Sequence, residues 1–295
     1  MRGLPFSIVD VFAEEKYAGN PLAVVRRGDG LTSESMQKIA REINFSETTF
    51  IVRETRHRGG FEVRIFTPAA ELPFAGHPTL GTAYVIQRDL IREPVRKVVL
   101  NLKVGPIPVF FTYVRGKPDI LWMRQIEPRF GQIMDPRRVA PVLDLRPGDL
   151  RPDFPVQEVS TGIPFVIVPV KTLDAIKRSR FRQEKMAGLT TDKRGKAFLL
   201  FSPETYADRN DLNVRVFAHA YGVAEDPATG SANGCLAGYL VRHHFFGEKS
   251  IDIRVEQGQE IGRPSLLLLQ AGVKAGRIEV RVGGRVVPVA RGRLV

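Results

Sequence analysis

Three ionisable residues stand beside turns or apolar segments where they could move protons. His77 directly follows Gly76. Asp226 comes four residues before Gly230, and Glu47 lies between an apolar helix pattern and the strand-like stretch TTFIV. Because apolar surroundings disfavour a charged carboxylate, the pKa of Glu47 is expected to rise toward the range useful for proton transfer. The structural alternatives for Glu47 are a connector that faces water and an ion-pair partner for a nearby arginine.

Gly76 and Gly230 each stand where a turn opens a helix pattern. The first N–H groups of a helix are unpaired and carry partial positive charge, so they attract carboxylate or phosphate. Glycine at such a position lets a ligand approach the backbone closely. Ser231 follows Gly230 and could add an anion-binding hydroxyl, or it could be an ordinary first-turn residue. The alternative for both glycines is a plain helix start, shaped by Pro73 and Pro227.

The two turns belong to one pattern that occurs twice in the chain. Residues 71–86 read ELPFAGHPTLGTAYVI and residues 225–240 read EDPATGSANGCLAGYL, with Glu, Pro, Gly and Ala matching at one constant offset. Upstream of them, VRIF at 63–66 is echoed by VRVF at 214–217. The period is far longer than the roughly 20–50 residues of a solenoid unit. The repeat therefore predicts two similar halves whose helix starts could face each other across one site.

The elements that must hold these residues are mostly strands. Strand patterns cover residues 5–13, 22–27, 48–54, 58–68, 97–105, 107–116, 164–170, 197–202, 213–219, 250–258, 265–273, 277–284 and 286–292. Helix patterns cover 31–43 with Ser33 as the N-cap, the segment from Pro78 to 92, a segment from Thr172, and a segment from Gly230 to about His244. Strands do not alternate strictly with helices, so the predicted fold class is α+β rather than a doubly wound sheet.

The domain organisation follows from the repeat. The N-terminal lobe is expected over residues 1–117, with a C-terminal strand at 284–295 returning to it. The C-terminal lobe is expected over 118–283. Residues 118–155 are rich in proline and are expected to form an irregular crossing between the lobes.

Composition limits the other possibilities. The single Cys235 excludes an internal disulfide framework, and no Cys/His cluster has zinc-like spacing, so we expect a cytoplasmic protein without a metal. Cys235 itself is expected to pack in the core. No apolar run approaches the roughly 18 residues of a membrane span. The net charge of +12 could reflect an anionic or nucleic-acid partner, or scattered solvated side chains. The basic run from Lys171 to Lys196 is interrupted by acids and holds one aromatic residue, Phe181, which favours the second interpretation.

Several longer segments resemble the phenazine-biosynthesis PhzF-like family, which shares the diaminopimelate epimerase fold. These segments are DVFAEEKYAGNPLAVV (10–25), NFSETTFIV (44–52), RIFTPAAELPFAGHPTLG (64–81), STGIPFVIV (160–168), EDPATGSANG (225–234) and QGQEIGRPS (257–265). The resemblance spans nearly the whole chain. It implies two pseudo-symmetric lobes, each a sheet curled around a central helix, and a homodimer. It also implies isomerisation of trans-2,3-dihydro-3-hydroxyanthranilate, or of a similar small carboxylate, without cofactor or metal.

Carried over residue by residue, the resemblance makes Glu47 the proton shuttle, with His77 and Asp226 as the other catalytic residues. The implied substrate-binding residues are Ser46, Gly76, Gly230 and Ser231. Neither turn contains a cysteine, which disfavours the two-thiol racemisation of related epimerases. Ala218-His219 stands where many relatives have Ala-Pro, so the conformation of this turn could differ from theirs.

Two other functions stay open at this point. One is an epimerase or racemase that uses Glu47 with Asp226 or His77. The other is a non-catalytic binding or regulatory protein on the same scaffold. The expected partners are a small carboxylate-bearing substrate and a second copy of the chain, with neither nucleic acid nor a membrane.

Overall fold

The structure is a computed structural model that describes residues 3–189 and 196–295. The chain divides into two compact units. Unit 1 comprises Met1–Arg124 and Gly283–Val295, and unit 2 comprises Gln125–Val282. The predicted boundary at 117 lies inside unit 1, where a strand begins. Both units combine strands with few helices, which confirms the α+β class.

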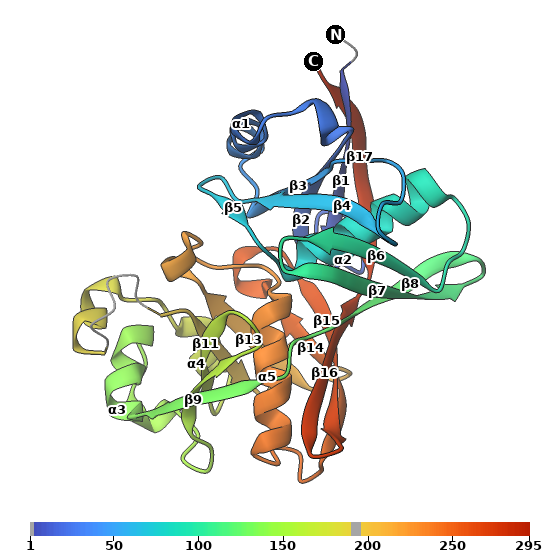
Figure 1. Ribbon diagram of the computed structural model, residues 1–295. Helices are drawn as coiled ribbons and strands as arrows, with labels where there is room; N and C mark the ends of the chain where they lie inside the picture. Colours follow the sequence, from blue (N-terminus) through green and yellow to red (C-terminus); the bar gives the residue numbers. More distant parts are fainter. Residues whose placement is uncertain (1–2, 190–195) are drawn as a thin grey trace. The chain divides into compact units, whose positions relative to one another are not determined.

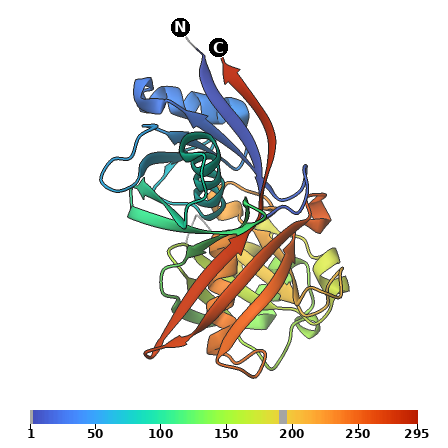
Figure 2. The same ribbon diagram turned by 90° about the vertical axis from the view of Figure 1, so that its right-hand side faces the viewer.

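Unit 1 is built on a curled sheet. Its strands are β1 (Leu4–Val11), β2 (Asn20–Arg26), β3 (Glu47–Ile51), β4 (Phe61–Phe66), β5 (Glu71–Leu72), β6 (Lys97–Leu102), β7 (Gly105–Val114), β8 (Lys117–Arg124) and β17 (Val286–Leu294). Strand β1 pairs antiparallel with both β2 and β17, and the two chain ends therefore run side by side (Figure 1; Figure 2). The parallel pairs β2–β3 and β4–β6 and the antiparallel pairs β3–β4, β4–β5, β6–β7 and β7–β8 complete the sheet.

Helix α2 (Gly76–Val85) is the central helix of unit 1, and a π-helical turn (Ile86–Ile91) continues it. Every residue of α2 is buried, and the helix contacts β1, β2, β3, β6, β7 and β8. The approach is close at Gly81, where a Cβ atom would lie 2.6 Å from Leu22 Cδ2 and 2.8 Å from Val11 Cγ2. A helix enclosed on all sides is mostly apolar, and the buried hydroxyls of Thr79 and Thr82 in this one are hydrogen-bonded, to the Ala75 carbonyl and to Thr49.

Helix α1 (Ser33–Ile43) packs its apolar face on the other side of the unit 1 sheet. Met36 and Ala40 are buried against Val25, Phe50 and Phe66. The predicted N-cap at Ser33 is wrong by one residue. The Thr32 side chain accepts a hydrogen bond from the Ser35 N–H at 3.1 Å, and Thr32 has the extended backbone of a cap.

Unit 2 repeats the plan with a second central helix, α5 (Gly230–Arg242). Its strands are β9 (Arg129–Met134), β10 (Val156–Ser160), β11 (Pro164–Pro169), β12 (Phe198–Ser202), β13 (Leu212–Phe217), β14 (Ser250–Gln257), β15 (Ser265–Lys274) and β16 (Arg277–Gly284), which ends at the unit boundary. Residues 230–241 are buried, and α5 contacts β10, β11, β12, β14 and β15. Figure 1 shows α5 with strands of unit 2 on both sides. Two short helices, α3 (Pro136–Val139) and α4 (Leu173–Arg178), belong to the same unit.

The chain passes from unit 1 to unit 2 inside the segment 118–155, at Arg124–Gln125, but the expectation that this segment is irregular throughout is wrong. This segment contains most of β8 and all of β9 and α3, followed by short 3₁₀ turns. Its prolines stand where regular structure tolerates them. Pro118 is the second residue of β8, next to the hairpin turn, and Pro136 is the first residue of α3, behind the Asp135 cap.

Part of the predicted basic run, residues 190–195, lies outside the described residues. Phe181 stacks on His219 with ring centroids 4.2 Å apart and also contacts Phe198 and Phe217. His219 begins a short 3₁₀ turn, which settles the local geometry after Ala218. None of the helices in the described ranges is both long and apolar enough to cross a membrane.

Candidate active site

Unit 1 brings Glu47 and His77 together. Glu47 is the first residue of β3, its side chain is 15% exposed, and half-buried Ser46 precedes it. His77 is the second residue of α2, and its side chain is 4% exposed. The His77 Nε2 atom lies 3.5 Å from Glu47 Oε2. The pairing of β3 with β2 and the burial of α2 thus place two candidate residues, 30 positions apart in sequence, in contact.

Burial holds His77 in its neutral form. It lowers the pKa of His77 from 6.5 to about 3, against the opposing effect of a hydrogen bond with the backbone of Pro21. Proline has no N–H, so its carbonyl must accept this bond from the imidazole. Among the described atoms Nε2 has no hydrogen-bond partner, so Nδ1 is the donor. The neutral ring therefore presents the lone pair of Nε2 to Glu47.

Both central helices begin without a side-chain cap in the described structure. At α2 the cap position is Ala75, which has no acceptor, and at α5 it is Thr229, whose hydroxyl does not bond the first turn. The other three α-helices are capped by the side chains of Thr32, Asp135 and Thr172. The N–H groups that start α2 and α5 are therefore left for other acceptors, as at anion-binding helix starts.

Unit 2 gathers Asp226, Gly230 and Ser231 on one turn. Asp226 and Ser231 are each 8% exposed. The Thr229 hydroxyl donates a hydrogen bond to Asp226 Oδ2 at 2.6 Å, and the Asp226 N–H donates to the Val216 carbonyl at 3.1 Å. The carboxylate is thus held in one orientation beside the start of α5.

The sequence repeat encodes the same ion pair in each unit. In unit 1, Arg64 Nε and Nη2 each donate to Glu71 at 2.8 Å. In unit 2, Arg215 Nε and Nη2 donate to Glu225 at 2.8 and 2.7 Å. We call these pairs the Arg–Glu clamps. In each unit the arginine lies on a strand, β4 or β13, and the glutamate lies at the start of the turn that leads into the central helix. Each clamp therefore fixes the path of that turn.

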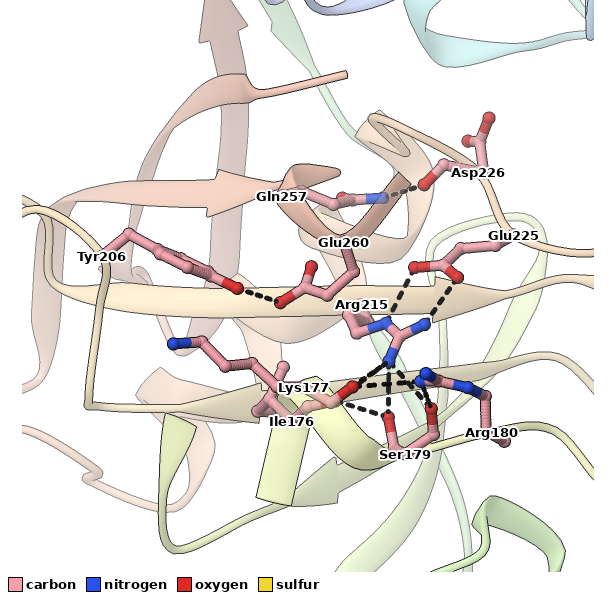
Figure 3. Close-up of polar contacts among 10 residues, drawn as sticks. All are labelled: Ile176, Lys177, Ser179, Arg180, Tyr206, Arg215, Glu225, Asp226, Gln257 and Glu260. Carbon is pink, nitrogen blue, oxygen red and sulfur yellow. Dashed lines mark hydrogen bonds and ion pairs between the residues drawn. The ribbon is translucent and has the colours of Figure 1, made fainter. Parts of the chain in front are cut away.

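The clamp of unit 2 is the more deeply buried, with Arg215 4% exposed against 25% for Arg64. Arg215 Nη1 also donates to the carbonyls of Ile176 and Ser179 at the end of α4, at 3.0 and 2.8 Å (Figure 3). In unit 1 the hydrogen bond from the Arg64 guanidinium holds the pKa of Glu71 below its usual range.

The candidate residues therefore fall into two groups, one in each unit. The unit 1 group is Ser46, Glu47, Gly76 and His77, and the unit 2 group is Asp226, Gly230 and Ser231. That both groups act on one substrate stays a prediction. Pro21, Thr229 and Gln257 contact the candidates, and no sequence pattern assigned these three residues to the site. The only signal for Gln257 was its place at the start of the motif QGQEIGRPS.

Two further features bear on the chemistry. Burial raises the pKa of the Cys235 thiol to about 11, so this cysteine is a poor nucleophile and packs in the core. In the part of the chain that the structure describes, no three His, Cys, Asp or Glu side chains are grouped so that they could hold a metal ion.

Comparison with known proteins identifies the family. The family model described as "Phenazine biosynthesis-like protein" (PhzC-PhzF) matches residues 9–292. A trans-2,3-dihydro-3-hydroxyanthranilate isomerase of Pseudomonas aeruginosa is 34% identical over 293 residues, covering 98% of both chains. An uncharacterized isomerase of Mesorhizobium japonicum is 34% identical over 295 residues, with the same coverage.

Solved structures agree with this assignment. The crystal structure of a PhzF-family phenazine biosynthesis protein from Bacillus anthracis matches with a TM-score of 0.91 and 28% identity over the whole of both chains. A probable proline racemase from Agrobacterium radiobacter, 11% identical, matches with a TM-score of 0.62 and so shares the fold. With its duplicated plan and its full-length matches, the chain belongs to the PhzC-PhzF family of phenazine biosynthesis-like proteins and is an isomerase.

Proposed function

We propose that this isomerase moves a proton between two positions of a small carboxylate-bearing substrate, without a cofactor, by acid–base catalysis at Glu47. The observation that carries the proposal is the contact between Glu47 Oε2 and the neutral Nε2 of His77 at 3.5 Å. A base that takes a proton from one carbon and returns it to another must hold that proton in between. A neutral imidazole acceptor supports this, because it can accept a hydrogen bond from the acid form of Glu47.

The remaining candidates fit the other needs of such a reaction. Removing a proton beside a carboxylate builds negative charge, which uncapped helix N–H groups can stabilise. Gly76, Gly230 and Ser231 stand at such helix starts. Asp226, held by Thr229, is suited to orient an amino or hydroxyl group of the substrate. Acid–base catalysis by one group contributes roughly 10²–10⁴-fold, so positioning must supply much of the remaining acceleration.

The first compound to test is the substrate named for the Pseudomonas aeruginosa relative. Trans-2,3-dihydro-3-hydroxyanthranilate bears a carboxylate, an amino group and a hydroxyl group, the three functions that the candidate residues could hold. A panel of small cyclic carboxylates and amino acids widens the search.

The test is deuterium incorporation, followed by NMR in D₂O, with wild type and Glu47→Gln side by side. Glu42→Gln, on the exposed part of α1, is a matched control for the same chemical change. We expect exchange with wild type and Glu42→Gln and a loss of at least about 10²-fold with Glu47→Gln. Full turnover by Glu47→Gln would refute the proposal.

The same spectra separate the alternatives. Deuterium at a new carbon indicates an isomerase that relocates a double bond, whereas deuterium at the original carbon with inversion indicates an epimerase or racemase. Binding with neither deuterium incorporation nor conversion of any compound in the panel would support a non-catalytic role. The homodimer stays a prediction, which sedimentation equilibrium tests directly.

A further inference from the structure

We propose that Gln257 is a positioning residue that fixes the carboxylate of Asp226 and keeps the first turn of α5 open for an anionic group of the substrate. The inference rests on the proposed function of Asp226 and of the α5 start. Gln257 is the last residue of β14, and it lies 31 positions from Asp226 in sequence.

The side-chain amide of Gln257 joins four groups of the loop and of α5. Its Nε2 donates to the Asp226 carbonyl at 2.7 Å, shown in Figure 3, and to Thr229 Oγ1 at 3.1 Å. Its Oε1 accepts from Asn233 Nδ2 at 2.9 Å and from the Thr229 N–H at 3.3 Å. Gln257 is fully buried, and an amide has two donor hydrogens and one oxygen with two lone pairs. Every hydrogen-bonding position of this amide is therefore used.

These bonds determine the direction of one proton. The Thr229 hydroxyl has a single hydrogen, and its oxygen accepts from Gln257 Nε2. The hydrogen must therefore point elsewhere, and Asp226 Oδ2 is 2.6 Å away. A hydrogen bond to a carboxylate is stronger than one between neutral groups, so this bond holds Asp226 firmly. Gln257 thus orients Asp226 through Thr229.

The same arrangement affects the helix start. A threonine at the N-cap usually accepts a hydrogen bond from the second or third N–H of its helix. Thr229 stands at the N-cap of α5, yet its side chain makes no such bond in the described structure. The Thr229 hydroxyl instead accepts a hydrogen bond from Gln257 Nε2 and donates one to Asp226 Oδ2. The N–H groups of the first turn are therefore not consumed by an internal cap.

The backbone next to Gln257 is shaped for this contact. Gly258 has φ +87°, and a Cβ atom there would lie 2.6 Å from the Pro227 carbonyl oxygen. Glycine lets the end of β14 lie directly against the loop. At the other end of the loop, the Arg215–Glu225 clamp holds the residue before Asp226. The loop from Glu225 to Thr229 is thus fixed from both sides.

The experiment compares Gln257→Leu with Gln157→Leu in the full chain. Gln157 is also a buried glutamine of the unit 2 sheet, and it bonds Gly131 and His243 rather than the loop. Both variants replace a buried, hydrogen-bonded amide by leucine. If loss of a buried amide lowers activity only by destabilising the fold, both variants should lose activity to a similar extent.

Two measurements are made on each protein. The first is hydrogen exchange of the Thr229 amide in the substrate-free state, which needs no knowledge of the substrate. The second is kcat and KM for the compound that exchanges deuterium with wild type. For Gln257→Leu we expect at least about tenfold faster Thr229 exchange and at least about tenfold lower kcat than for Gln157→Leu.

Gln257→Glu supplies a readout that a purely structural role would not move. Its carboxylate form cannot donate to Thr229 or to the Asp226 carbonyl, whereas its protonated form regains one donor. We expect Thr229 protection and relative kcat of this variant to rise as pH falls, against a wild type measured at the same pH.

The outcomes are separable from those of the proposed function. Unchanged Thr229 exchange in Gln257→Leu, or a kcat within about twofold of Gln157→Leu, would overturn the positioning role. If wild type catalyses neither exchange nor conversion of any compound, the proposed function fails instead. Faster Thr229 exchange would then still support the ordering of the loop by Gln257.

Discussion

The neutral state of buried His77 makes the folded protein lose stability in acid. The pKa of His77 is about 3 in the folded protein, against 6.5 for an unperturbed histidine. Between these values the unfolded chain binds a proton that the folded chain does not, so stability rises with pH in this window. The full stability is present above about pH 6.5 and is lost progressively as pH falls toward 3. Each pH unit corresponds to about 1.4 kcal/mol, so at pH 5 the loss from this residue is about 2 kcal/mol.

The assay is urea unfolding at pH 7 and pH 5 for wild type and His77→Asn. Asparagine does not titrate in this range, and its Nδ2 can donate to the Pro21 carbonyl as the imidazole Nδ1 does. We expect the free energy of unfolding to fall by about 2 kcal/mol more in wild type than in the variant. His57→Asn, at an exposed position of unit 1, is the control and should behave like wild type.

Nitrogen-15 NMR of labelled histidine gives the direct test. A neutral His77 with the proton on Nδ1 has two distinct ring nitrogens that do not change between pH 8 and 5. If His77 instead titrates near or above 6.5, or if the two proteins lose equal stability, the ring is a cation paired with Glu47. That result would refute the reasoning that Nε2 accepts the proton of Glu47.

The remaining predictions concern packing and the clamps. Glu225→Gln should lower the free energy of unfolding by about 3 kcal/mol, because it leaves the buried Arg215 without its carboxylate; Glu71→Gln, in the more exposed clamp, should cost less. Denaturant titration measures both, and equal costs would contradict the argument from burial. Gly81→Ala should destabilise by about 1–3 kcal/mol, since its Cβ would lie 2.6 Å from a leucine methyl, whereas Gly148→Ala meets no atom within 4 Å and should be nearly neutral. Differential scanning calorimetry of this pair decides the point.

The sequence predicted most strands because their patterns are local. Alternation of apolar residues marks β1 and β14, and an unbroken apolar run marks β12, without reference to the rest of the fold. The N-cap of α1 was misplaced because Thr32 and Ser33 are both good capping residues, and only the backbone conformation distinguishes them. Strand β9 was missed because prolines on both sides of it suggested irregular structure.

For the candidate site, the sequence predicted the ionisable residues but not the groups that orient them. The motifs pointed to Glu47, His77 and Asp226, because those residues stand beside helix starts or apolar strands. Their orienting partners, Pro21 and Gln257, lie far away in sequence and reach them only through sheet pairing. The group of Pro21 that contacts His77 is a backbone carbonyl, which every residue has, so the residue type at position 21 does not predict the contact. The tautomer of His77 could therefore not be inferred before the structure was known.

The Arg–Glu clamps show which residues the two halves of this protein share and where the halves differ. Both copies keep the arginine, the glutamate and the phenylalanine under the guanidinium, 5.1 Å from it in unit 1 and 4.9 Å in unit 2. What each turn then carries is different: a histidine in one half and an aspartate in the other. The same scaffold of the turn is therefore present twice in one chain, and each copy places a different ionisable side chain beside its central helix.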